Sequence, residues 1–281
     1  MELFDEIAGL LANCCSRREL LPVKRALVDV AALYRGEWPG YGRCHTPYHD
    51  LQHALDVTLT LARLLHGYHA AAPRRRALPG ALVALGLICA LFHDAGYLRK
   101  RADRRRPHGA AYTVVHVRRS GRFLTEYLQQ RGQPQRAALA RRIVAYTAHG
   151  PVRRCEGDEP DAVLGCMLAS ADLLAQVADR WYLEKCLYRL HPEFVIAGML
   201  PATGGGHGSA RAMLEATPAF MRQTRRALDE RLGGVHAYLQ QHDGGRNPYL
   251  DGYRANLRRL EELLASNTLD RLQPPPSWPL G

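Results

Sequence analysis

Two stretches decide the fold of this sequence: Tyr48-His49-Asp50-Leu51-Gln52-His53-Ala54-Leu55-Asp56 and, about forty residues later, His93-Asp94. His49 and His53 are four residues apart, so in a helix they project from one face, one turn apart. The pair His93-Asp94 ends the apolar run from Ala81 to Phe92, which predicts a buried helix. Two polar side chains at that position are costly unless something binds them. The pattern therefore predicts a metal site inside a helical protein.

Three further ligand-type residues stand alone in apolar helical segments: His116, His149 and Asp172. Asp172 lies among alanine and leucine residues, where a buried carboxylate needs a partner, and a metal is the partner we predict. His116 lies on or beside the apolar face of its segment, and His149 ends its segment before a Gly-Pro pair. Along the chain the ligand types follow the order H, HD, H, H, D.

The two motifs resemble those of a known protein family. Residues Tyr48 to Val57, with Phe92-His93-Asp94, are similar to the HD superfamily of metal-dependent phosphohydrolases. They particularly resemble the Tyr-His-Asn-x-x-His-Ala-x-Asp-Val signature of class I 3',5'-cyclic nucleotide phosphodiesterases, and the likeness covers roughly residues 48 to 182. The resemblance implies that His49 is the acid that protonates the leaving oxygen. It also implies that four residues hold the first metal: His53, His93, Asp94 and Asp172.

The sequence departs from the phosphodiesterase pattern at two positions. Asp50 stands where those enzymes have asparagine, and Tyr97 stands where they have a further histidine. Instead, His116 and His149 look like the additional histidines of HD-GYP-type and di-iron HD proteins. This likeness implies a second metal that is held by His116 and His149 and shares Asp94 with the first.

The predicted ligands are imidazoles and carboxylates without a thiolate. Such a set suits Fe, Mn, Zn or Mg and argues against a structural zinc. With the resemblance, it implies hydrolysis of a phosphoester of a nucleotide or cyclic nucleotide by a water that two divalent ions activate, with His49 and Asp94 as catalytic residues. Arg99 and Lys100 follow the HD pair in a basic loop, where we expect them to bind the phosphate. Two alternatives stay open: an HD-fold di-iron oxygenase, which has a similar ligand order, and a non-catalytic HD sensor or regulatory module.

Composition limits the partners. The 281 residues are 47% hydrophobic, enough for one sizeable core, and their formal net charge is +11. Such a charge can reflect a polyanion partner or the codon bias of a GC-rich genome. The arginines are scattered and no aromatic-interleaved basic motif accompanies them, which disfavours nucleic acid. The predicted partner is a small phosphoester, and the oligomeric state stays open.

The sequence favours a cytoplasmic protein without a membrane segment. The N-terminus lacks a basic n-region, and the longest apolar run falls well short of the roughly 20 residues of a membrane span. No C-x-x-C pair occurs, so we expect free thiols of a reducing compartment at all seven cysteines: Cys14, Cys15, Cys44, Cys89, Cys155, Cys166 and Cys186.

Periodicity predicts an all-α fold, an HD-domain helical bundle in a single domain, with no strand pattern. Within it we expect four segments: an N-terminal helical cap (1–44), an HD core (45–200), C-terminal helices (201–270) and an extended tail (271–281). Thr46 is expected to cap a helix that runs to His69, so that His49 and His53 lie in its first turns. One long helix is expected over 210–241, and residues 202–209 are expected to form a glycine-rich loop or lid.

Overall fold

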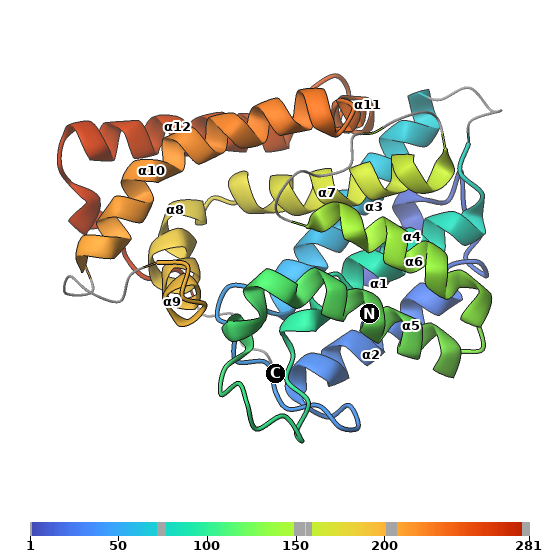
Figure 1. Cartoon of the computed structure of the whole chain (residues 1–281). Coiled ribbons are helices and arrows are strands. Elements are labelled where there is room, and N and C mark those ends of the chain that lie inside the picture. The colour runs from blue at the N-terminus through green and yellow to red at the C-terminus, as the bar shows by residue number, and fades with distance from the viewer. Residues whose placement is uncertain (1, 72–76, 149–154, 156–158, 201–206, 277–281) are drawn as a thin grey trace.

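The computed structural model describes residues 2–71, 77–148, 155, 159–200 and 207–276. Helices dominate these residues, and no strand occurs among them; two isolated bridges pair Tyr41 with Lys100 and Asp243 with Arg246. The predicted all-α, single-domain fold is confirmed (Figure 1). The α-helices are α1 (Glu2–Leu10), α2 (Leu21–Arg35), α3 (Leu51–Ala71), α4 (Gly80–Phe92), α5 (His116–Gln130), α6 (Ala137–Val144), α7 (Pro160–Val177), α8 (Tyr182–Lys185), α9 (His191–Ile196), α10 (His207–Arg226), α11 (Tyr238–His242) and α12 (Pro248–Ala265).

Helix α4 is the centre of the main core. It is apolar on every side, so it can lie only where other helices surround it. Helices α2, α3, α6 and α7 all pack against it. The apolar run therefore forms the buried helix that its composition predicts, and it ends by delivering His93 and Asp94 into the interior.

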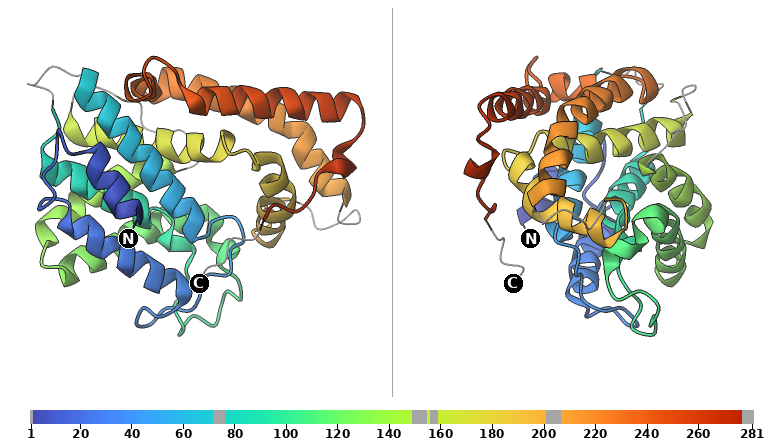
Figure 2. Two further views of the ribbon diagram at one scale, coloured as in Figure 1. Left: turned by 180° about the vertical axis from the view of Figure 1, so that it is seen from behind. Right: turned by 60° about the vertical axis from the view of Figure 1, so that its left-hand side comes forward.

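The N-terminal helices belong to the same core. Phe4 and Ile7 of α1 and Val23 of α2 are buried in one apolar cluster with Leu61 of α3. The C-terminal helices build a second, smaller cluster, in which Tyr48 takes part. Figure 2 shows α10 and α12 side by side, and α12 also packs against α7 of the main core. The stretch that carries the two histidines thus lies at the boundary between the two clusters.

Helix α3 begins later than the sequence pattern suggests. It starts at Leu51, and Asp50 caps it, because the Asp50 carboxylate accepts a hydrogen bond from the backbone N–H of His53 (2.9 Å). The prediction that Thr46 is the cap is wrong. The Thr46 hydroxyl instead donates to the carbonyl of His49 (2.8 Å) and holds the preceding residues in a turn. His53 is therefore helical and His49 is not.

The expected helix over 210–241 is broken. Helix α10 ends at Arg226, a π-helical turn covers Ala227–Arg231, and α11 follows at Tyr238. The break comes at Gly233 and Gly234, which both have positive φ angles, 66° and 65°. Glycine reaches this region of backbone space without steric cost, so the helical path can end there. Similarly, the segment before α5 is a 3-10 helix, Gly109–Val115, which makes His116 the first residue of α5.

One pair of cysteines departs from the expected free thiols. Cys155 and Cys166 form a disulfide, so that prediction is wrong for these two residues. Cys166 is buried in α7, and the backbone N–H of Cys155 donates to the carbonyl of Arg231 (3.0 Å). The bond ties the chain before α7 to the helix that carries Asp172. The other five cysteines are free.

Two stretches have the length and composition of membrane spans: Gly80–Tyr97 and Pro160–Val177. Neither is an uninterrupted apolar run, because the first contains Asp94 and the second contains Asp161 and Asp172. Both stretches lie mostly inside the molecule, with 83% and 61% of their residues buried. Their hydrophobicity is used in packing against neighbouring helices.

The contact between α3 and α11 gives a test of the fold. A Cβ atom at Gly67 would lie 1.8 Å from the carbonyl oxygen of Tyr238, so Gly67→Ala must push α11 away from α3. We expect this variant to lose about 1–3 kcal/mol of unfolding free energy in a denaturant titration. Gly9→Ala in α1 is the matched control, because nothing lies within 4 Å of its Cβ position, and helix propensity favours alanine by up to about 1 kcal/mol. Equal losses in both variants would contradict the packing described here.

Candidate metal centre

Four side chains from three parts of the chain point their ligand atoms at one another. His53 comes from α3, His93 and Asp94 from the end of α4, and Asp172 from α7. His53 Nε2 lies 3.1 Å from Asp172 Oδ1 and 3.5 Å from Asp94 Oδ2. His93 Nε2 lies 3.2 Å from Asp94 Oδ2 and 3.6 Å from Asp172 Oδ1.

The tautomer of His93 follows from its other nitrogen. Nδ1 lies 2.7 Å from the carbonyl oxygen of Ala90, and a carbonyl only accepts, so Nδ1 must carry the proton. The neutral ring therefore presents a lone pair at Nε2. Both His93 Nε2 and Asp94 Oδ2 are buried without a hydrogen-bond partner among the described residues. Two buried acceptors that face each other need a proton or a cation between them.

The separations suit a cation. Ligand atoms about 2.1 Å from one ion, at angles of roughly 90–109°, are about 3.0–3.4 Å apart. The observed separations of 3.1–3.6 Å overlap that range. The ligand atoms of His53, His93 and Asp172 all lie within 4.8 Å of one another and could hold a metal ion. Imidazole and carboxylate donors without a thiolate suit Fe, Mn, Zn or Mg, as the sequence indicates.

The second oxygen of Asp94 faces another histidine. His116 Nδ1 donates to the carbonyl of Thr113 (2.5 Å), so the neutral ring turns its lone pair at Nε2 toward Asp94 Oδ1, 3.6 Å away. The two carboxylate oxygens of Asp94 thus face different imidazoles. Gly96 allows this approach, because a Cβ there would lie 1.9 Å from the carbonyl oxygen of His116. The predicted third partner, His149, lies outside the described residues.

The buried ionisable groups of the centre shift one another's pKa values strongly. Burial by itself lowers the pKa of His93, but the negative charge of Asp94 and the contact with Asp172 outweigh it and raise that pKa well above its usual value. Burial also works against ionisation of Asp94, yet the positive charge of His93 holds the pKa of Asp94 well below its usual value. Either protons on the imidazoles or a bound cation therefore neutralise the carboxylates.

A buried acid that sequence analysis did not identify holds His49. Glu193 in α9 is fully buried, and its Oε2 accepts from His49 Nδ1 (2.5 Å). Its other oxygen accepts from the backbone N–H groups of Tyr48 (2.6 Å) and His49 (3.2 Å), which keeps this stretch out of the helix. Burial lowers the pKa of His49, but the charge and hydrogen bond of Glu193 prevail and raise it to about 9. His49 also stacks on Tyr97, with the ring centroids 4.2 Å apart.

A cavity of about 330 Å³ opens onto these groups. His49, His53, Asp94, His116 and Asp172 all line it. The structure thus brings together every predicted metal ligand that it describes and places the predicted acid beside them. His93 lies just behind the wall, with 1% of its surface exposed.

The two predicted phosphate-binding residues lie elsewhere. Arg99 donates to the carbonyl of Asp103 (2.9 Å), and the ammonium group of Lys100 lies 3.8 Å from Glu126 and 5.8 Å from the ring centroid of Tyr41. Neither residue lines the cavity. The reason is that the 3-10 turn Ala95–Tyr97 is followed by extended backbone, which carries both side chains away from the metal ligands.

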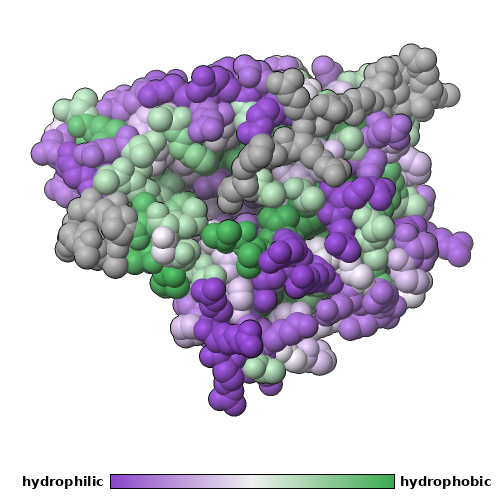
Figure 3. Space-filling view, in the orientation of Figure 1, coloured by the Kyte–Doolittle hydropathy of each residue, from purple (hydrophilic) through white to green (hydrophobic). Residues whose placement is uncertain are grey.

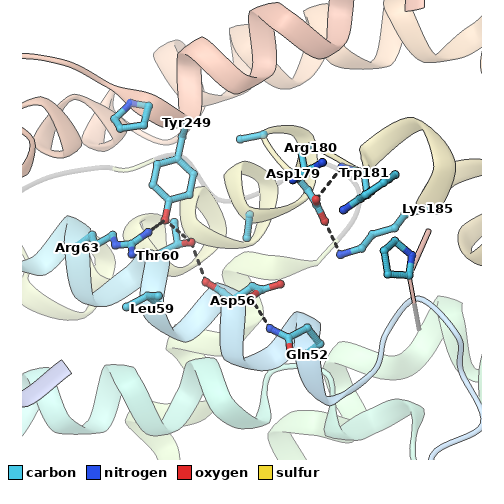
Figure 4. Close-up of a pocket in the computed structure, with 14 residues that line it drawn as sticks. Gln52, Asp56, Leu59, Thr60, Arg63, Asp179, Arg180, Trp181, Lys185 and Tyr249 are labelled. Atoms are coloured by element: carbon cyan, nitrogen blue, oxygen red, sulfur yellow. Dashed lines mark hydrogen bonds and ion pairs between the residues drawn. The ribbon is translucent and has the colours of Figure 1, made fainter. Parts of the chain in front are cut away.

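A larger hollow of about 900 Å³ is lined by another stripe of α3 together with the end of α7 (Figure 4). Its charged groups already have partners in the protein. Gln52 donates to Asp56 (2.8 Å), and Lys185 forms an ion pair with Asp179. None of the predicted metal ligands lines this hollow. We therefore place the chemistry in the smaller cavity.

The sequence matches no protein-family model and no curated protein. The resemblance to HD phosphohydrolases consequently rests on the motif residues alone.

The pKa shifts predict how metal affinity depends on pH. A divalent cation must displace the proton that Asp94 and Asp172 stabilise on His93, so affinity should rise with pH, by about tenfold per unit for each proton displaced. Calorimetric titration with Mn²⁺ or Zn²⁺ between about pH 6 and 8, in buffers of different ionisation enthalpy, measures both the affinity and the protons released. His45→Gln, an exposed histidine outside the cavity, is the control. Constant affinity without proton release would contradict the assigned charge state.

Proposed function

We propose that this protein is a metal-dependent phosphohydrolase of the HD type, which cleaves a phosphoester such as that of a nucleotide or cyclic nucleotide. One observation carries the proposal: two carboxylates and two imidazoles of the cluster line a cavity together with His49, whose pKa is raised by the buried Glu193. The ligand cluster suits binding of a cation, which in turn would bind a phosphate. His49 suits donation of a proton.

The described residues divide into two sets of ligands. His53, His93 and Asp172, with Asp94 Oδ2, would hold one ion; His116 and Asp94 Oδ1 would contribute to a second. Ions bound there supply a water of lowered pKa and positive charge for the phosphoryl oxygens. Asp94 fixes the spacing of the two sets because its carboxylate is rigidly placed at the end of α4.

His49 provides the proton for the leaving oxygen. Glu193 occupies Nδ1, so Nε2 is the only ring position from which His49 can donate into the cavity. The stacked ring of Tyr97 and the buried Glu193 hold the imidazole in one orientation. Glu193 acts through His49 and is a positioning residue. An oxygenase has no obvious need for a charged proton donor of this kind, so the pair favours hydrolysis.

The proposal is tested by metal content and activity together. Protein stripped with a chelator and reloaded with Mn, Fe, Zn or Mg should hydrolyse a phosphodiester, and Asp94→Ala should lose both ions and turnover, because Asp94 serves both ligand sets. His116→Ala should fall from about two ions to about one. Full activity and full metal content in Asp94→Ala would contradict the assignment of Asp94 to the metal site. Oxygen uptake without phosphoester turnover would instead support the alternative that the protein is a di-iron oxygenase.

Variants of the proton donor should keep the metal and lose turnover. We expect His49→Gln to lose about 10²- to 10⁴-fold in kcat on an alkyl leaving group and much less on a nitrophenolate, which needs no proton. Activity that requires protonated His49 falls as pH rises through its pKa. Glu193 raises that pKa, so in Glu193→Gln the alkaline fall should begin at lower pH. His45→Gln is the control; loss of metal from His49→Gln would show that His49 is a ligand.

A further inference from the structure

Away from the metal ligands, the walls of the cavity are apolar. Gln176 and Thr217 are the polar exceptions at that end. The protein has 38 lysines and arginines, yet none of them is among the described residues that line the cavity. The apolar end is formed by side chains from α7 to α10: Leu173, Tyr182, Leu190, Phe194, Met213 and Phe220.

The apolar surface continues out of the cavity. Ile196, Met199 and Phe220 are 46%, 49% and 40% exposed, and all three lie in or next to α9 and α10, which contribute to the cavity wall. Phe220 itself lines the cavity, and the N–H of Met199 donates to the carbonyl of Phe194 (2.9 Å), which is a residue of the cavity wall. Figure 3 shows apolar surface gathered where α9 and α10 lie. We call Ile196, Met199 and Phe220 the apolar rim.

This distribution discriminates between classes of phosphoester. A polyphosphate carries several charges, and burying them requires cationic or hydrogen-bonding partners at each phosphate. A phosphodiester carries one negative charge, which a cation held by the metal ligands, together with protonated His49, would neutralise. Binding is then favoured when the apolar ester group is removed from water by contact with the apolar wall and the rim.

We infer that the substrate is an amphiphilic phosphodiester with a long alkyl or aryl group, an inference that rests on the proposed function. The phosphate lies at the metal ligands, and the apolar group runs past Phe194 and Met213 and leaves the cavity over the apolar rim. In the reaction, water adds to phosphorus and one ester P–O bond breaks. The leaving alcohol takes a proton from His49, and the products are a phosphomonoester and an alcohol.

A homologous series of substrates tests this inference. The metal-loaded full-length protein is assayed with methyl, butyl and octyl 4-nitrophenyl phosphate below their micelle concentrations. Each methylene that becomes fully buried should raise kcat/KM by about fourfold, so the butyl ester should exceed the methyl ester by roughly ten- to sixty-fold. Phe220→Ser and Met213→Ser should flatten this dependence on chain length, and Phe220→Leu should restore most of it.

Val28→Ser is the matched control, because Val28 is an apolar side chain of α2 that is 67% exposed and does not line the cavity. Its dependence on chain length should equal that of the wild type. Turnover of the methyl ester with no gain for longer chains overturns the inference and leaves the proposed function intact. So does a preference of tenfold or more for a nucleotide or cyclic nucleotide over the octyl ester. Absence of turnover with every ester overturns the proposed function itself.

Discussion

The constraint on which this structure depends is that several buried acceptors face one another. The Nδ1 atoms of His93 and His116 are committed to backbone carbonyls, so both rings turn their remaining nitrogen toward the carboxylate of Asp94. Acceptors that share a dry pocket repel unless positive charge lies between them. The fold must therefore supply protons or a cation at this point, and it must hold the groups rigidly enough that they do not simply turn away.

Helix packing provides that rigidity. Helix α4 packs against five other helices, and its last turn can place His93 and Asp94 only in the interior. Helices α3 and α7 pack against each other and against α4, which brings His53 and Asp172 to the same point. The site is thus assembled from three helices of one core, and the energy that buries the polar groups comes from the apolar packing around them.

The other half of the cavity has a different origin. Glu193, which orients His49, comes from α9, and the apolar wall comes from α7 and the helices that follow it. The cavity lies where the main core meets the smaller C-terminal cluster, and Tyr48 joins the second while Leu51 joins the first. The ligand cluster and the apolar wall meet in α7, where Asp172 and Leu173 are neighbours in the sequence.

The helical class, the buried helix before His93 and the residue types of the ligands can be predicted from local sequence, because helical periodicity and the cost of buried charge are local properties. Only the tertiary structure decided which acid orients His49: Glu193 is 144 residues away along the chain, and no local pattern marks it. It also decided that α3 begins at Leu51 and that Arg99 and Lys100 point away from the cavity. These features depend on which helices meet in space, and that is set by the packing of the whole core rather than by any segment of the chain.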